Sequence, residues 1–124
     1  MQYRPTAAEL LDTVAQLLVD EVLEAVAGPL QHRVRVAAHL TRMVQREIAN
    51  AAQADTNERE RLALILAEPG ADLAALRAQL AHRLADPERI DTALNRDIHD
   101  ALLATARADL AICKPGYDRW TAEP

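Results

Sequence analysis

The sequence predicts an all-α protein. Apolar residues recur at helical spacing along most of the 124 residues, and proline, glycine and capping residues separate the periodic segments. The only aromatic residues, Tyr3, Tyr117 and Trp120, lie at the two ends, so Ala, Leu, Val and Ile must form the core. The expected architecture is a single small antiparallel bundle of about five helices, three long helices and one short hairpin. It would form one domain over residues 1–124, with residues 114–124 as a C-terminal tail.

The first helix is expected to begin after Pro5, where Thr6 and Glu9 have the spacing of a capping box. It should end near Ala27, before Gly28-Pro29. Its apolar positions at helical spacing are Leu11, Val14, Ala15, Leu18, Val22, Ala25 and Val26. Leu10 and Leu17 widen this set beyond what one neighbouring helix covers. We therefore expect the first helix to lie between two partners.

The remaining helices follow from their start and stop signals. A second helix over about residues 30–53 should bury Val34, Ala37, Val44 and Ile48, and the polar residues 55–58 can cap a short third helix that ends at Pro69-Gly70. A fourth helix is expected from Asp72 to Ala85, before Asp86-Pro87. Asp91 can cap the last helix, which should end before Pro115-Gly116.

Composition limits the classes of function. The formal net charge of −5 argues against sequence-independent binding of nucleic acid, which requires many cations facing phosphates. The single cysteine, Cys113, has no partner for an internal disulfide. No apolar run has the length of a membrane span, and the amino terminus lacks the pattern of a signal peptide. These features favour a cytoplasmic protein.

Catalytic and metal-binding motifs are weak. His99-Asp100 resembles the dipeptide of metal-dependent phosphohydrolases, but further ligands from other helices would be needed, so a surface pair is expected. The sequence contains no glycine-rich phosphate loop and no serine-centred nucleophile elbow. With no aromatic wall for a nucleotide pocket, we expect no catalytic residue, bound cofactor or metal, and hence no free-standing enzyme.

Charges are segregated between the first two predicted helices. Residues 5–29 contain five acids and no base, whereas His32, Arg35, His39, Arg42 and Arg46 recur at spacings of three and four, on one side of the second helix. This row can pair with the acidic first helix, or it can dock an acidic protein surface or the phosphates of a ligand. A DNA-binding helix-turn-helix is a weaker alternative, because the row runs along the whole helix instead of its first turns.

Several segments together resemble an all-helical bacterial family of proteins of unknown function, which includes the small subunit of the levulinate-pathway 4-hydroxyacyl-CoA kinase. The resemblance is carried by Arg4-Pro5-Thr6-Ala7-Ala8-Glu9-Leu10-Leu11, Arg35-Val36-Ala37-Ala38, Arg46-Glu47, Asp109-Leu110-Ala111-Ile112, Pro115 and Tyr117. The resemblance spans nearly the whole chain. It rests on the order and spacing of these segments, and no single motif among them is specific to the family.

This resemblance implies an accessory subunit beside a larger kinase that looks like the aminoglycoside phosphotransferases. The large subunit would bind ATP and magnesium and phosphorylate the hydroxyl of a hydroxyacyl-CoA, since the groups that phosphoryl transfer requires are missing from this sequence. Candidate partner-binding residues are Arg35, His39, Arg42 and Arg46, with Tyr117 and Trp120 as anchors. The alternative is a self-associating structural or regulatory bundle, a possible homo-oligomer without a kinase partner.

Overall fold

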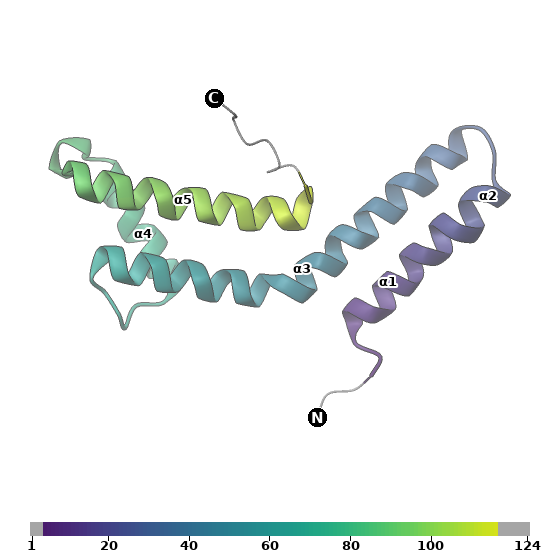
Figure 1. Cartoon of the computed structure of the whole chain (residues 1–124), viewed down its shortest axis with the longest axis horizontal. Helices are drawn as coiled ribbons and strands as arrows, with labels where there is room; N and C mark the ends of the chain where they lie inside the picture. Colours follow the sequence, from purple (N-terminus) through teal and green to yellow (C-terminus); the bar gives the residue numbers. More distant parts are fainter. Residues whose placement is uncertain (1–3, 117–124) are drawn as a thin grey trace. The chain divides into compact units, whose positions relative to one another are not determined.

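The computed structural model describes residues 4–116 and is all-α, as the sequence predicts (Figure 1). Tyr3, Tyr117 and Trp120 lie outside the described residues. Within residues 4–116 there is no strand, and four helices are present instead of the five expected. The chain divides into two compact units. Among the described residues, the first comprises 4–51 and 112–114, and the second comprises 52–111 with 115–116.

The first helix starts where the sequence predicts. It is built from α1 (Ala7–Leu17), a π-helical segment η1 (Leu18–Val22) and the short α2 (Leu23–Ala25). Thr6 Oγ1 accepts a hydrogen bond from the Glu9 amide at 3.2 Å, and the Thr6 amide donates to Glu9 Oε2 at 2.7 Å, so both halves of the capping box form. The helix ends before Gly28, whose φ of 66° suits the turn.

The predicted second and third helices are one helix, α3 (Pro29–Leu66), so the expected break at residues 55–58 is wrong. The polar side chains there find partners inside the helix. Thr56 Oγ1 donates to the Ala52 carbonyl at 3.0 Å, and Gln53 Nε2 donates to Asn57 Oδ1 at 2.9 Å. Because this segment contains neither glycine nor proline, the helix continues at a cost of only tenths of a kcal/mol per residue.

The end of α3 is a Schellman motif. The Glu68 amide donates to the Ala63 carbonyl at 3.0 Å and the Ala67 amide to the Leu64 carbonyl at 3.4 Å. Ala67 takes the left-handed position with a φ of 55°, where glycine is the usual residue. Pro69 alone would allow the helix to continue to residue 68, the position before the proline, but α3 ends at Leu66.

The second unit contains the main core. Here α4 (Leu73–Leu84) begins next to Asp72, which caps it, and α5 (Thr92–Cys113) begins next to Asp91. Asp91 Oδ1 accepts a hydrogen bond from the Leu94 amide at 2.7 Å and so caps α5, as expected. A short 3-10 helix, η2 (Pro87–Arg89), joins them. The buried core residues come from α3, α4 and α5: Leu62, Leu66, Leu76, Leu80, Ile98 and Ala101.

An ion pair on the surface of this unit links α3 to α4. Arg77 Nη2 lies 2.6 Å from Glu58 Oε2, and Arg77 Nε donates to Glu58 Oε1 at 3.0 Å. The hydrogen bond with Glu58 raises the pKa of Arg77 above its ordinary value, against the opposing effect of desolvation. The charged guanidinium therefore links α4 to α3 at the surface of this unit, beside the buried contacts of Leu76 and Leu80.

The first unit is a helical hairpin with little core of its own. α1 packs against the first part of α3, and the buried residues between them are Ala15, Val34 and Ala38. The expected burial of Ala37, Val44 and Ile48 is wrong within this unit, since Ala37 is exposed and Val44 and Ile48 are 46% and 52% exposed. One helix covers only one side of another, so the other sides of both helices remain open.

Candidate interaction surface

The basic row predicted from sequence lies on the first part of α3, within the first unit. Its five members are His32, Arg35, His39, Arg42 and Arg46, and all lie on the continuous helix that begins at Pro29. Helical spacing of three and four residues puts them along one side of α3. Their environments differ, and these differences decide which of them a partner could reach.

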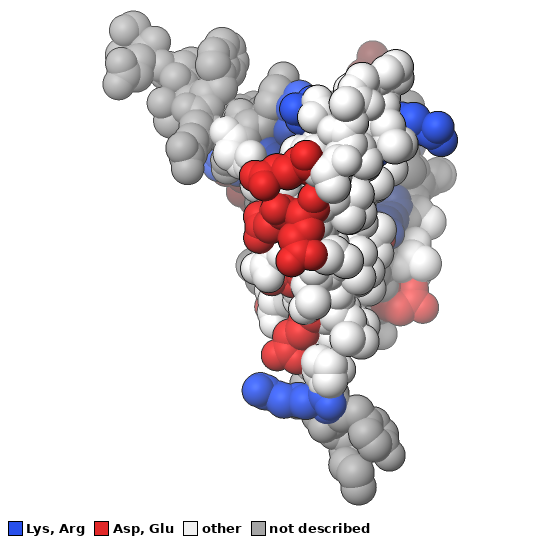
Figure 2. All heavy atoms as spheres, turned by 90° about the vertical axis from the view of Figure 1, so that its right-hand side faces the viewer, with Lys and Arg blue, Asp and Glu red and all other residues white. Residues whose placement is uncertain are grey.

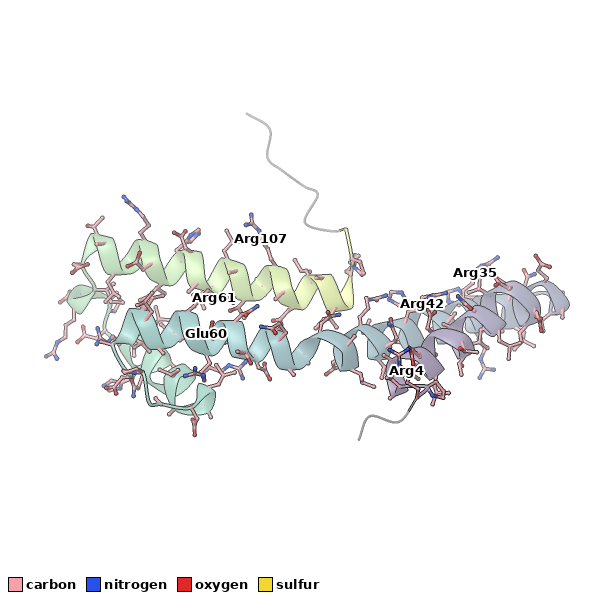
Figure 3. The ribbon with its side chains drawn as sticks, turned by 60° about the horizontal axis from the view of Figure 1, so that its bottom comes forward. Arg4, Arg35, Arg42, Glu60, Arg61 and Arg107 are labelled. Carbon is pink, nitrogen blue, oxygen red and sulfur yellow. The ribbon has the colours of Figure 1, made fainter. Side chains whose placement is uncertain are left out.

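Arg42 is held by the first helix. Its Nη1 donates to Asp12 Oδ1 at 2.8 Å, and the two side chains are 38% and 43% exposed (Figure 3). At this exposure an ion pair contributes about 0.2–1 kcal/mol. The sequence-based expectation that the basic row can pair with the acidic helix is therefore realised at Arg42, where the pair links α1 to α3.

Arg46 is also held, by a backbone group at the end of α5. Its Nε donates to the Ile112 carbonyl at 2.7 Å, which satisfies one of the last carbonyls of that helix. Its Nη2 is buried and has no hydrogen-bond partner. Arg46 therefore has a structural role in the first unit, and its substitution would disturb that unit as well as any interface.

Arg35, His39 and His32 remain exposed. Figure 3 shows Arg35 extending outward from α3, in contrast to Arg42, which points toward α1. Of the candidate partner-binding residues, Arg35 and His39 are thus directly accessible, Arg42 and Arg46 are engaged within the unit, and Tyr117 and Trp120 lie outside the described residues. Sequence spacing alone could not separate these cases, because it does not show which side of α3 meets α1.

The His99-Asp100 dipeptide is an exposed pair. His99 Nδ1 lies 3.6 Å from Asp100 Oδ1, and both side chains are more than 70% exposed. Among residues 4–116, no group of three or more His, Cys, Asp and Glu side chains is arranged to hold a metal ion.

An open groove of about 350 Å³ in the second unit is lined by Arg61, Asp97 and Asp100 together with Leu64, Ile65 and Ala101.

A second surface, which sequence reasoning did not identify as a site, lies on the apolar sides of the hairpin. We call it the apolar face, defined by Leu10, Val14 and Leu17 of α1 and Val36, Leu40 and Val44 of α3. These side chains are between 41% and 53% exposed, and Leu30 and Ile48 at its margins are 48% and 52% exposed. The sequence contained one signal of this surface, since Leu10 and Leu17 make the apolar stripe of the first helix wider than one neighbouring helix covers.

The apolar face lies opposite the Arg42–Asp12 ion pair. Leu10 and Val14 each lie two residues from Asp12, and Leu40 and Val44 each lie two residues from Arg42. Two residues correspond to about 200° of rotation around an α-helix, which is nearly the opposite side. Leu10, Val14, Leu40 and Val44 are therefore on the side of the hairpin opposite the ion pair. Leu17 and Val36 are each two residues from a residue buried between the helices, so they point outward at the two edges of the apolar face.

Acidic side chains complete the surface of the hairpin. Glu9, Asp12, Asp20, Glu21 and Glu24 all belong to the first helix, which has no base between Pro5 and Pro29. In Figure 2 a column of acidic side chains borders a broad uncharged surface on this side of the molecule. Charged and uncharged surfaces are thus separated over the length of α1 and α2.

These features define an all-α protein with an amphipathic helical hairpin, whose distinctive chemistry lies on exposed helix sides. A family model described as a domain of unknown function, DUF6285, matches residues 24–117. The chain therefore belongs to this family, in agreement with the resemblance to an unknown-function family. No curated protein and no solved structure matches the chain. None of the helices within residues 4–116 combines the length and the apolar character that crossing a membrane requires.

Proposed function

We propose that this protein is a non-catalytic accessory subunit that binds and supports an aminoglycoside-phosphotransferase-like kinase in the cytoplasm. The kinase would phosphorylate the hydroxyl of hydroxyacyl-CoA substrates of the 4-hydroxyacyl type, as in levulinate catabolism. In this proposal ATP and magnesium belong to the kinase, and this chain contributes neither a catalytic group nor a cofactor site.

The observation that carries the proposal is the exposed part of the basic row. Arg35 and His39 lie one turn apart on α3 and are open to solvent, while Arg42 and Arg46 are fixed beside them by internal contacts. A row of arginine and histidine side chains on one helix suits an acidic protein surface, since arginine is enriched in the energetically important parts of interfaces. The segments Arg35–Ala38 and Arg46-Glu47 that carry the family resemblance lie in the same region.

Co-purification with the kinase tests this surface. The double variant Arg35→Glu, His39→Glu, which places two negative charges on this surface, should weaken capture of the kinase by about tenfold or more, because like charges would then face the acidic partner. Arg42 and Arg46 are less suitable, since their replacement also removes the contacts to Asp12 and Ile112. Arg107→Glu, a reversal at an exposed position of α5, is the matched control and should leave capture unchanged.

An activity assay tests the role itself. ATP consumption by the kinase on hydroxyacyl-CoA esters is measured with the kinase alone, with this chain alone, and with both. The proposal expects full activity only for the mixture and none for this chain alone. Full activity of the kinase by itself would contradict an accessory role, and turnover by this chain alone would contradict a non-catalytic one.

The apolar face favours a second candidate, a self-associating structural or regulatory bundle that acts without a kinase. Exposed apolar side chains along two neighbouring helices are a common property of helices that pack in larger bundles. In that case the isolated chain forms a stable oligomer, and addition of the kinase leaves its size unchanged in light scattering. The two candidate functions therefore predict different results in light scattering, because only an accessory subunit would form a larger complex with the kinase.

A further inference from the structure

The apolar face contains two charged residues placed symmetrically about its centre. Along α3, Arg33 lies seven residues before Leu40 and Glu47 lies seven residues after it. Seven residues are close to two helical turns, so all three lie on the same side of α3. Arg33 and Glu47 are exposed, and within residues 4–116 neither has an ion-pair partner.

We propose that the apolar face binds the apolar face of a second copy of this chain, with α3 packed antiparallel on α3 about a two-fold axis at Leu40. In that arrangement Leu40 meets its own counterpart, and Val36 meets Val44 of the second copy. Arg33 of each copy lies opposite Glu47 of the other, so that two ion pairs flank the apolar centre. Opposite charges at equal distances from one residue are the pattern that an isologous interface requires.

The first helix fits the same axis. Because α1 and α3 run antiparallel and Asp12 contacts Arg42, a step of two residues forward from Asp12 corresponds to a step of two residues back from Arg42. Val14 therefore lies at the level of Leu40. The axis then brings Val14 against its counterpart and Leu10 near Leu17 of the second copy, and the two hairpins form a four-helix bundle.

The exposed area agrees with a stable dimer. Leucine, valine and isoleucine side chains that are about half exposed offer roughly 80 Å² each, and the apolar face with its margins Leu30 and Ile48 then offers about 650 Å² per copy and about 1,300 Å² for the pair. This total is in the range of specific interfaces. The polar rim supplied by Arg33 and Glu47 fixes the antiparallel orientation, since a parallel arrangement would bring like charges together.

The dimer does not rest on the proposed kinase partnership. Arg42, the fourth of the five residues in the basic row, is two residues from Leu40 and Val44, so this part of the row lies on the opposite side of the hairpin from the centre of the apolar face. Both surfaces can be used at once. Failure of kinase capture by the Arg35 and His39 variant would leave the dimer proposal intact, and a monomeric chain would leave kinase binding intact.

Charge exchange tests the orientation. In sedimentation velocity the full chain is expected to be a dimer at micromolar concentration. Arg33→Glu and Glu47→Arg, each alone, should raise the dissociation constant of the dimer by about tenfold or more, because each places like charges opposite each other. The double variant Arg33→Glu, Glu47→Arg restores opposite charges and should recover dimerisation. Circular dichroism on each variant establishes that its helix content is unchanged.

Crosslinking tests the axis directly. In a Cys113→Ser background, which removes the one exposed cysteine, Leu40→Cys should form an intermolecular disulfide under mild oxidation, since the proposed axis places this position against itself. Arg35→Cys, on the basic row, is the matched control and should remain reduced in the dimer.

Three results would overturn the proposal. The first is a full chain that remains monomeric at micromolar concentration, whether its apolar face is covered by another part of its own chain or reserved for another protein. The second is a dimer whose dissociation constant does not respond to the single charge reversals or is not recovered by the exchange. The third is a dimer in which Leu40→Cys does not crosslink, which excludes the axis at this residue.

Discussion

The end of α3 offers a stabilising substitution whose magnitude follows from one backbone angle. Ala67 closes the Schellman motif with a φ of 55°, a conformation that costs an L-residue with a side chain about 1–2 kcal/mol. Glycine removes this cost but has more freedom in the unfolded chain, which offsets about 0.4–1 kcal/mol. Ala67→Gly should therefore raise the free energy of unfolding by about 0.5–1 kcal/mol.

The assay is chemical denaturation followed by circular dichroism at the helical minimum, with a thermal melt in which the midpoint should rise by about 2–4 °C. Ala78→Gly is the matched control, because Ala78 is exposed in the interior of α4 and the same substitution there should cost about 1 kcal/mol. Gly28→Ala is the reverse experiment. Its φ is 66° and an added Cβ would meet no atom within 4 Å, so no clash is expected. The expected cost is about 0.5–1 kcal/mol, which is the left-handed strain less the reduced freedom of the unfolded chain.

A decrease in stability for Ala67→Gly, similar to that of Ala78→Gly, would refute the reasoning. It would mean that Ala67 is helical in solution and that α3 continues beyond Leu66. An unchanged midpoint for Gly28→Ala would contradict the same argument at the other turn, because it would show that a left-handed φ at Gly28 is not required there.

The remaining predictions concern the core and the first cap. Leu76 is fully buried in the second unit, so Leu76→Ala should lower the free energy of unfolding by about 2–5 kcal/mol, whereas Leu64→Ala, at a position 84% exposed, should change it by less than about 0.5 kcal/mol; urea unfolding compares the two. Thr6→Ala removes the side-chain acceptor of the capping box and should cost about 1 kcal/mol. Amide exchange at Glu9 should then increase, and unchanged protection there would contradict a role for the cap.

Local sequence signals predicted the helix starts well. The predicted capping box at Thr6 and Glu9 and the predicted cap at Asp91 are present, and the helix expected from Asp72 begins at Leu73 with Asp72 as its cap. Each of these starts depends only on residues within one turn. Residues 55–58 show the limit of the same logic. Asp55 and its neighbours are typical capping residues, but a cap requires that the preceding helix end, and no glycine or proline ends it.

The sequence also predicted the candidate surface only in part. Spacing alone placed Arg35, His39, Arg42 and Arg46 on one side of a helix. It could not show that Asp12 would engage Arg42 and that the Ile112 carbonyl would engage Arg46, because these contacts join residues 30 and 66 positions apart. The division of the basic row into exposed and engaged members is therefore a tertiary property.

The sequence by itself determined that this protein is all-α, where most of its helices begin and end, and that its charges are segregated between the first two helical segments. These properties follow from hydrogen bonds and side-chain periodicity within one or two turns. The continuity of α3 also follows from local sequence, since its middle contains neither glycine nor proline. Only the tertiary structure decided which basic side chains remain accessible and that Leu40 lies in an open apolar face. Such properties depend on which side of each helix packs against another helix. Helical periodicity in the sequence predicts which residues share one side of a helix, but not which segment covers that side.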